Sequence, residues 1–177
     1  MSQSQNTLQL DHLRRAAKRL AKDHAIGLAA ALERIRVHPP RAEGTTLRHA
    51  DYLHVVAQEQ NFPSWPALKL AAETIGLDRA TLQQRLKMAL AHGQNRVVEH
   101  LLSETPDLAD GLLGAQIALY DLNAVRMALR ANPTAATQQL GPRPPMAHLC
   151  FSKWHQVRPE LRDDMMAIAE LLLAHGA

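Results

Sequence analysis

The chain has 177 residues, enough for one ordinary domain or two small ones with a buried core. Apolar residues make up 46% of it and aromatic residues only 3%, and this alanine- and leucine-rich mixture favours helices over strands. The net charge of +3 permits a nucleic-acid partner without demanding one, and a single cysteine, Cys150, excludes an intramolecular disulfide.

The sequence also bears on location. Residues 1–6 are polar and lack the apolar run of a signal peptide, and no uncharged stretch approaches the roughly 20 residues that span a bilayer. A lone cysteine favours a reducing compartment. We therefore expect a soluble, cytoplasmic protein with no membrane partner.

The first predicted helix spans residues 8–22. One of its faces is apolar and consists of Leu13, Ala16, Ala17 and Leu20. A second helix is predicted over residues 28–36, and Pro39-Pro40 forbids its continuation. Its inward residues are expected to be Leu28, Leu32 and Ile35.

Two further helices complete the first part of the chain. The third is expected to follow a threonine N-cap at Thr46. The fourth is capped by Ser64, and Gly76 is its expected C-terminal stop, because glycine enters the left-handed region without steric cost. Phe62 and Trp65 are expected to close the core between these two helices.

From Asp78 onward the chain repeats itself. Asp78 is placed to cap a helix over residues 79–92, which Gly93 ends, and a second helix is predicted over residues 95–103. A shift of 27 positions carries four residues onto similar ones: Val98, Leu102, Pro106 and Ala109 onto Val125, Leu129, Pro133 and Ala136. A further shift of 43 carries three of these onto Ile168, Leu172 and Gly176. Such self-similarity is typical of stacked helix pairs.

Three fragments resemble a known family. The end of the chain, Leu-Leu-Leu-Ala-His-Gly-Ala177, resembles the second helix of an ankyrin repeat. Pro145-Met146 matches part of the ankyrin opening Thr-Pro-Leu-His-x-Ala, although Pro144, Ala147 and Leu149 replace its Thr, His and Ala. Residues 49–69, with Phe-Pro-Ser-Trp-Pro-Ala-Leu-Lys, resemble a helical module that precedes ankyrin repeats in bacterial proteins.

The resemblance implies an all-α fold with two parts. We expect an N-terminal helical bundle over residues 7–76 and three degenerate ankyrin-like units over residues 78–110, 111–137 and 138–177. An ankyrin unit runs about 33 residues, so the first interval indicates a hairpin trimmed to a turn at Asp110-Gly111. The longer second interval places an insertion at residues 153–164, which we expect to protrude from the rim.

Ankyrin-like repeats carry no catalytic motif, so the resemblance implies no enzyme and no cofactor. It implies a scaffold or adaptor that binds another protein along the concave face of first helices and hairpin loops. The candidate partner-binding residues are Gln83, Gln84, Lys87, Gln116, Tyr120, Gln138, Gln139 and Arg143. For most of them the alternative is plain solvation. Tyr120 stands where the first unit has Gly93, and it is either an exposed anchor or a filler of the gap left by the short loop.

The alternative function is nucleic-acid binding by the first helix. Its face opposite the apolar one carries Arg14, Arg15, Lys18, Arg19 and Lys22. Five cations within nine residues are able to track a phosphate backbone. The same pattern is ordinary on the solvated side of an amphipathic helix, and no aromatic residue interleaves for base stacking, so we favour solvation.

The sequence offers no clear metal or catalytic site. His49 and His54 are turned away from each other by their spacing, and there is no Cys pair, so no metal ion is expected. Ser152 lies one turn after His148, the minimal spacing of a nucleophile and a base, but lacks an orienting carboxylate. Cys150 is expected to be a small core residue.

The apolar end of the chain suggests one more contact. Leu171, Leu172 and Leu173 are consecutive, so at least one of them should face outward, where a terminal unit normally presents polar residues. Either the natural chain continues beyond Ala177, or another subunit covers this end by self-association.

Overall fold

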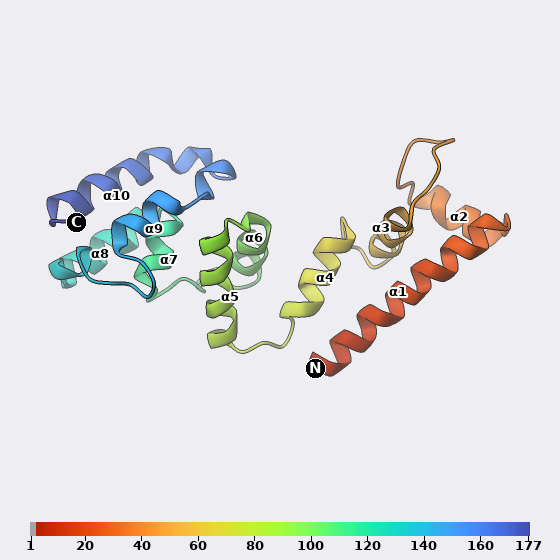
Figure 1. The fold of residues 1–177 in the computed structure, drawn as a ribbon, viewed down its shortest axis with the longest axis horizontal. Coiled ribbons are helices and arrows are strands. Elements are labelled where there is room, and N and C mark those ends of the chain that lie inside the picture. Colours follow the sequence, from red (N-terminus) through yellow and green to blue (C-terminus); the bar gives the residue numbers. More distant parts are fainter. Residues whose placement is uncertain (1–2) are drawn as a thin grey trace. The chain divides into compact units, whose positions relative to one another are not determined.

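A computed structural model describes the backbone of residues 3–177 and the side chains of residues 9–177. Within this part every regular element is a helix: ten α-helices and three short 3₁₀ helices occur, and no strand (Figure 1). The expectation of an all-α protein is therefore confirmed. The chain divides into two compact units, Met1–Leu77 and Asp78–Ala177, called here the N-terminal and the C-terminal unit. None of the described helices combines the length and apolarity that a membrane span needs.

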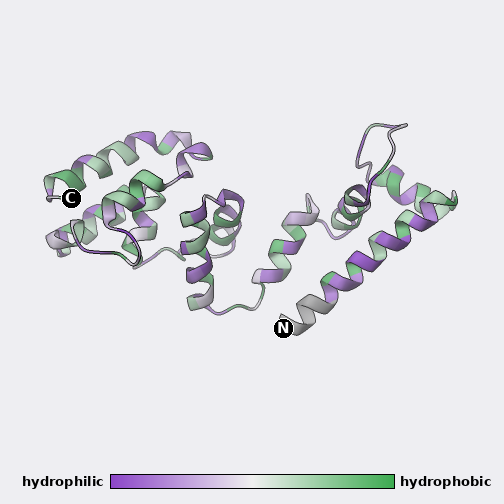
Figure 2. Cartoon of the chain, viewed as in Figure 1, coloured by the Kyte–Doolittle hydropathy of each residue, from purple (hydrophilic) through white to green (hydrophobic). Residues whose placement is uncertain are grey.

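The N-terminal unit is built on one long helix. Its helices are α1 (Gln3–Ala25), α2 (Ala29–Val37), α3 (His49–Glu59) and α4 (Trp65–Thr74). α1 packs against the other three helices, and α3 packs against α4. The buried residues of α1 are Leu10, Leu13, Ala17 and Leu20. Hydrophobic and hydrophilic residues alternate along α1 as the helix turns, which is the pattern of an amphipathic helix (Figure 2).

α2 faces the core with a different side from the one expected. Leu28 and Leu32 are each 47% exposed, whereas Ala31 is buried and Ile35 is partly buried against the core. Ala31 and Ile35 are four residues apart and share a face, and Leu32 lies about 100° around the helix from Ala31. The expectation that Leu28 and Leu32 point inward was therefore wrong.

α3 begins two residues later than the threonine cap would require. Its N-cap is Arg48, and the Asp51 carboxylate accepts a hydrogen bond from the Arg48 backbone N–H at 2.7 Å. The Arg41 guanidinium Nε also donates to both Asp51 carboxylate oxygens at 2.9 Å. These contacts satisfy a helix-terminal donor and hold the pKa of the buried Asp51 below its usual value, the Arg48 N–H being the larger cause.

α4 starts as expected. The Ser64 hydroxyl accepts a hydrogen bond from the Ala67 N–H at 3.4 Å, and Phe62 and Trp65 lie partly buried against the core. Gly76, two residues after the helix, has a φ of 76°. The left-handed region favours glycine, so this residue lets the chain turn away after α4.

The C-terminal unit consists of three helix pairs with short 3₁₀ turns between some of them (Figure 1). The pairs are α5 (Arg79–His92) with α6 (Asn95–Glu104), α7 (Leu113–Ala118) with α8 (Leu122–Ala131), and α9 (Pro145–Phe151) with α10 (Arg162–Ala174). The 3₁₀ helices are η1 (Pro133–Ala136), η2 (Trp154–Gln156) and η3 (Pro159–Leu161). α7 packs against both α5 and α9, and α10 packs against α8 and α9, so one continuous core runs through the unit.

The predicted ends of α5 are confirmed. The Asp78 carboxylate accepts a hydrogen bond from the Thr81 N–H at 2.9 Å, and Gly93 follows the helix with a φ of 64°. Tyr120 occupies the same place after α7 and has a φ of 62°. A non-glycine residue there is uncommon.

The shift of 27 positions recurs in the backbone hydrogen bonds. After α5 the Gly93 N–H donates to Leu90 O and the Gln94 N–H donates to Ala89 O; after α7 the same bonds join Tyr120 to Ile117 and Asp121 to Gln116. The equivalence continues past the second helix of each pair, where Thr105 to Leu101, Leu108 to Thr105 and Asp110 to Asp107 correspond to Asn132 to Ala128, Ala135 to Asn132 and Thr137 to Thr134. The first two helix pairs therefore share the backbone hydrogen bonds of their turns, although α7 is shorter than α5.

The third pair departs from this pattern at Ser152. This residue follows α9 with an extended backbone (ψ 136°) in place of the left-handed one, so the tight turn does not form. The inserted residues 153–164 begin here. We expected these residues to protrude, but part of the insertion is buried: the Trp154 side chain is 4% exposed and belongs to the core. The Asn95 side-chain amide also donates to Lys153 O at 3.0 Å, which ties the insertion to the first helix pair.

Candidate functional site

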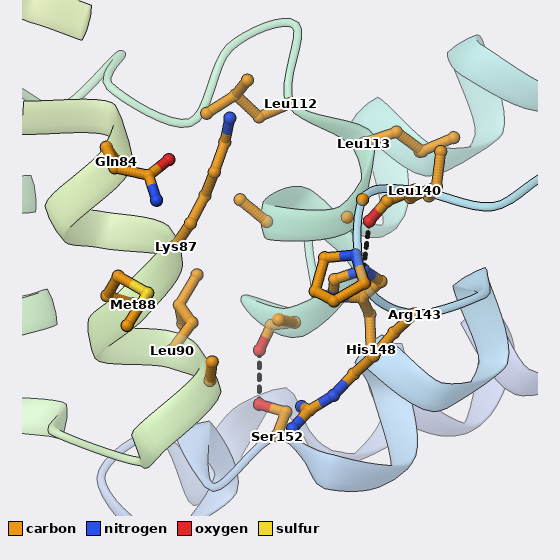
Figure 3. A pocket seen from close by; sticks show the side chains of 16 residues that line it. Gln84, Lys87, Met88, Leu90, Leu112, Leu113, Leu140, Arg143, His148 and Ser152 are labelled. Atoms are coloured by element: carbon orange, nitrogen blue, oxygen red, sulfur yellow. Dashed lines mark hydrogen bonds between the residues drawn. The ribbon is translucent and has the colours of Figure 1, made fainter. Parts of the chain in front are cut away.

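A groove of about 450 Å³ lies on the C-terminal unit between α5, α7, α9 and the turn at Leu140–Arg143 (Figure 3). Most of its lining is apolar: Met88, Leu90, Ala91, Leu112, Leu113, Gly114, Ala115, Ala118, Leu140, Gly141 and Pro142. Met88 is 49% exposed and presents its side chain at the groove. The groove is thus an apolar surface open to solvent, which we call the apolar groove.

One wall of the apolar groove is held by His148. The backbone N–H of Leu140 donates to Arg143 O at 2.9 Å, and Gly141 enters the intervening turn with a φ of 73°. His148 Nε2 lies 2.9 Å from Leu140 O, so this nitrogen carries the proton and donates to the carbonyl. A Cβ atom on Gly114 would lie 3.0 Å from the same nitrogen. Glycine at this position therefore leaves room for the imidazole that fixes the turn.

Ser152 closes the other wall. Its hydroxyl donates to Ala118 O at 2.5 Å and accepts from the Trp154 N–H at 3.2 Å. Ser152 and His148 both line the apolar groove, but each is hydrogen-bonded to a different backbone carbonyl. This arrangement ties α9 to α7 and fits a structural role for the serine better than a nucleophilic one.

Two cations stand at the rim. Lys87 and Arg143 both line the apolar groove, no carboxylate does, and neither cation pairs with an acidic side chain of the described residues. Figure 3 shows Lys87 extending toward Leu112 and Arg143 reaching in the opposite direction, toward Ser152. The Arg143 guanidinium carbon lies 4.7 Å from the centroid of the Phe151 ring, a cation–π contact that orients this side chain.

The structure brings together only part of the predicted binding set. Gln84, Lys87 and Arg143 lie at the apolar groove. Gln83 is turned aside, since its side-chain amide donates to Leu108 O at 3.2 Å. The remaining glutamines lie elsewhere: Gln116 lines a separate, more polar pocket of about 480 Å³, Gln138 donates to the Thr134 hydroxyl, and Gln139 is exposed outside the groove lining.

Tyr120 is not an exposed anchor. Its side chain is 1% exposed and packs in the core of the C-terminal unit. The phenol oxygen lies 3.4 Å from Ser152 O and 3.3 Å from His155 Nδ1. The exposed-anchor alternative is therefore wrong, and the polar contacts of the phenol are with Ser152 and His155, at the start of the insertion, and not with the short loop.

The residues that sequence reasoning missed are apolar ones. Met88 shares a face of α5 with Gln84, Lys87 and Ala91, because these residues follow the i, i+3, i+4, i+7 spacing. That spacing was visible in the sequence and places an apolar side chain on the face that also carries the polar candidates. The Leu140 side of the groove depends on the His148 hydrogen bond, for which the sequence offered no signal.

The basic face of α1 is exposed, as both interpretations of this face require. All five of its cations are exposed. Arg14 pairs with Asp11 at 2.7 Å, and the other four make no ion pair with a described residue. Elsewhere in the N-terminal unit arginines are neutralised: Arg34 pairs with Glu59, Arg36 with Glu33 and Arg41 with Asp51. The hydrogen bond from Arg36 lowers the pKa of Glu33, and that from Arg34 to Glu59 raises the pKa of Arg34.

The histidines and the cysteine do not form a site. Among the described residues there is no group of three or more His, Cys, Asp or Glu side chains placed to hold a metal ion. Cys150 is exposed, so the expectation of a core cysteine was wrong. Cys150 lies on α9, the first helix of the third pair, and its neighbour Phe151 is also exposed.

At the end of α10 one leucine faces outward, as expected. Leu172 is buried, whereas Leu173 is 61% exposed.

Comparison of the chain with protein-family models, with curated proteins and with solved structures gives no match.

Proposed function

We propose that the protein is a non-enzymatic adaptor that binds a segment of a partner protein in the apolar groove, on the concave face of an ankyrin-like stack. The observation that carries the proposal is an open apolar surface shared by three successive first helices, α5, α7 and α9. Exposed apolar surface of this kind, rimmed by polar groups, is typical of interaction sites.

The repeat supports the stack. The five turn hydrogen bonds named above for the first helix pair recur 27 positions later, and α7 packs against both α5 and α9. In stacked repeats each unit buries its apolar face against its neighbours, and first helices line one common face. The apolar groove is on the face that these first helices share.

The polar groups of the groove favour binding over catalysis. His148 Nε2 and the Ser152 hydroxyl are both engaged with backbone carbonyls, and no carboxylate lines the groove to orient either of them. A nucleophile needs a base within hydrogen-bond reach, and that base needs an orienting group. These contacts instead stiffen the walls, and stiffness lowers the entropic cost of binding.

A matched pair of methionine variants tests the proposal. Random peptides displayed on phage are selected against the full-length protein, and the enriched peptides are measured by fluorescence anisotropy. Met88→Asp places a charge on the groove wall, whereas Met127→Asp changes a methionine that is 70% exposed on α8, outside the groove. We expect Met88→Asp to weaken binding about tenfold or more, since it introduces a charge into an apolar contact, and Met127→Asp to leave it unchanged.

The result that overturns the proposal is equally defined. If no peptide is enriched, or if the enriched peptides bind Met88→Asp as well as the unaltered protein, the apolar groove is not the binding surface. Circular dichroism of both variants establishes that the helices are retained. Both methionines are about half exposed or more, so neither substitution removes a core side chain.

The basic face of α1 supports nucleic-acid binding as a second candidate. Arg15, Lys18, Arg19 and Lys22 are cations without an acidic partner among the described residues. If they contact phosphates, affinity for a short DNA duplex falls steeply with salt, and replacing three of them by alanine reduces the salt slope by roughly 2–3. Arg36→Ala is the control, because this arginine is already paired with Glu33. Absence of binding at low salt rejects this candidate.

A further inference from the structure

The apolar groove differs in charge from the unit that contains it. Residues 78–177 include ten basic and ten acidic side chains, so the C-terminal unit is neutral overall. The groove lining nevertheless has two cations and no anion. The separate polar pocket in the same unit is mixed, with Asp110, Asp121, Asp164, Arg126 and Arg158. Positive charge is therefore concentrated at the groove.

The two cations are placed to act on a ligand. Apolar walls exclude water and raise the strength of charge–charge contacts at the rim. The stacking of Arg143 on Phe151 holds the guanidinium in one orientation and leaves its in-plane N–H groups available for a carboxylate. Lys87 is an exposed side chain with three rotatable donors and no acidic partner among the described residues.

The cations lie toward opposite ends of the groove. In Figure 3 the Lys87 ammonium is beside Leu112, whereas the Arg143 guanidinium is near Ser152, with the apolar lining between them. An amphiphile with one acidic head, such as a fatty acid, would neutralise only one end. A neutral or basic segment would leave both cations unpaired. Only a ligand with acidic groups on both sides of an apolar centre satisfies the whole groove.

We propose that the partner segment is an acidic amphipathic peptide, with one or more large apolar side chains flanked on each side by aspartate or glutamate. This inference rests on the proposed function, because it names the chemistry of the segment that the groove binds. The apolar side chains contact Met88 and Leu113, and the flanking carboxylates pair with Lys87 and Arg143. The groove volume of about 450 Å³ is sufficient for a few apolar side chains.

Charge reversal provides the test. Phage-displayed random peptides are selected in parallel against the full-length protein, against Lys87→Glu/Arg143→Glu, and against Arg96→Glu/Arg130→Glu. The third protein carries the same change of charge on exposed arginines of α6 and α8, outside the groove. We expect acid–apolar–acid sequences from the unaltered protein and from this control, and basic amphipathic sequences from the groove variant.

Affinities sharpen the result. Anisotropy titrations of an enriched acidic peptide should show a loss of about tenfold for Lys87→Ala and for Arg143→Ala, the effect of removing one charge-assisted hydrogen bond. The affinity should also fall with added salt, because both pairs lie at an open rim. Arg96→Glu/Arg130→Glu should change it less than about twofold, since neither arginine lines the groove and salt screens contacts between exposed charges.

The outcomes separate the two proposals. If the selected peptides are neutral or basic and Met88→Asp abolishes their binding, the adaptor function stands and the proposal of an acidic partner is overturned. If both double variants weaken the binding of acidic peptides equally, the attraction is long-range and not specific to the groove, and this also overturns the inference. Peptides insensitive to Met88→Asp and to Lys87→Glu/Arg143→Glu refute both proposals. Dodecanoate, a fatty acid with one acidic head, serves as a competitor. If it binds tightly and displaces the peptides, the proposal of a ligand with acidic groups at both ends is refuted.

Discussion

Tyr120 provides the sharpest test of the repeat architecture, because its backbone and its side chain have opposite effects on stability. Its φ of 62° is left-handed, as is that of Gly93 in the equivalent place. An L-residue loses about 1 kcal/mol there relative to glycine. Its buried ring contributes more, since truncating a buried aromatic residue to alanine costs about 3–5 kcal/mol.

Two truncations at this position separate the terms. Tyr120→Ala should lower the free energy of unfolding of the C-terminal unit by about 3–5 kcal/mol, since alanine loses the ring and keeps the left-handed strain. Tyr120→Gly also loses the ring but relieves the strain, so its loss should be about 1 kcal/mol smaller. Tyr120→Phe should cost about 1 kcal/mol, because only the long phenol contacts to Ser152 and His155 are lost.

Urea unfolding measures these differences. In a Trp65→Phe background the remaining tryptophan, Trp154, is buried in the C-terminal unit, and its fluorescence follows the unfolding of that unit alone. Met127 on the exposed side of α8 provides the control, since in a helix interior Met127→Gly should be less stable than Met127→Ala by about 1 kcal/mol. The order of glycine and alanine should thus invert at Tyr120. If Tyr120→Ala is as stable as Tyr120→Gly, the equivalence of Tyr120 and Gly93 is refuted.

Three further expectations concern single hydrogen-bonded sites. Asp51→Asn should destabilise the N-terminal unit by about 1 kcal/mol at pH 7. Because folding lowers the pKa of Asp51, its contribution is fully present above the unfolded pKa of about 3.9 and is lost as the pH falls through the lower, folded pKa, so urea titrations should show a smaller difference at pH 2.5 than at pH 7. Gly114→Ala should stabilise the protein by about 1 kcal/mol, through the higher helix propensity of alanine, only when His148 is also replaced by alanine, because the new Cβ lies against the imidazole. A double-mutant cycle of thermal melts measures this coupling, and equal effects of Gly114→Ala in both backgrounds would contradict the contact between position 114 and His148. Ser152→Ala should cost about 1–3 kcal/mol by leaving the Ala118 carbonyl without its donor, and an unchanged melting temperature would show that water replaces the hydroxyl.

Features set by neighbouring residues were predictable from the sequence. Asp78 caps the helix that follows it and Gly93 ends the same helix, because a carboxylate beside free N–H groups and a glycine at a left-handed position act locally. Ser64 was predicted in the same way. Thr46 is not the cap, because α3 begins at His49, and Asp51, its third residue, accepts a hydrogen bond from the backbone N–H of the N-cap residue Arg48.

Features that depend on distant contacts were not predictable. Tyr120 is in a left-handed conformation that its own chemistry disfavours, and its burial beside Ser152 compensates for that cost. The groove turn is fixed by the His148 ring, eight residues away from the carbonyl that it binds. Cys150 is exposed although its neighbours in sequence are apolar, because exposure depends on which helices pack on that side of α9.

The recurrence of turn hydrogen bonds at a fixed interval has a consequence for the growth of such molecules. Gly93 and Tyr120 occupy equivalent turns with the same left-handed φ, so the segment between them begins and ends in the same backbone conformation. Tandem duplication of that segment would lengthen the array by one helix pair without requiring a new joint. Ser152 has an extended backbone in the equivalent place, so the third pair lacks the joint that the first two pairs share.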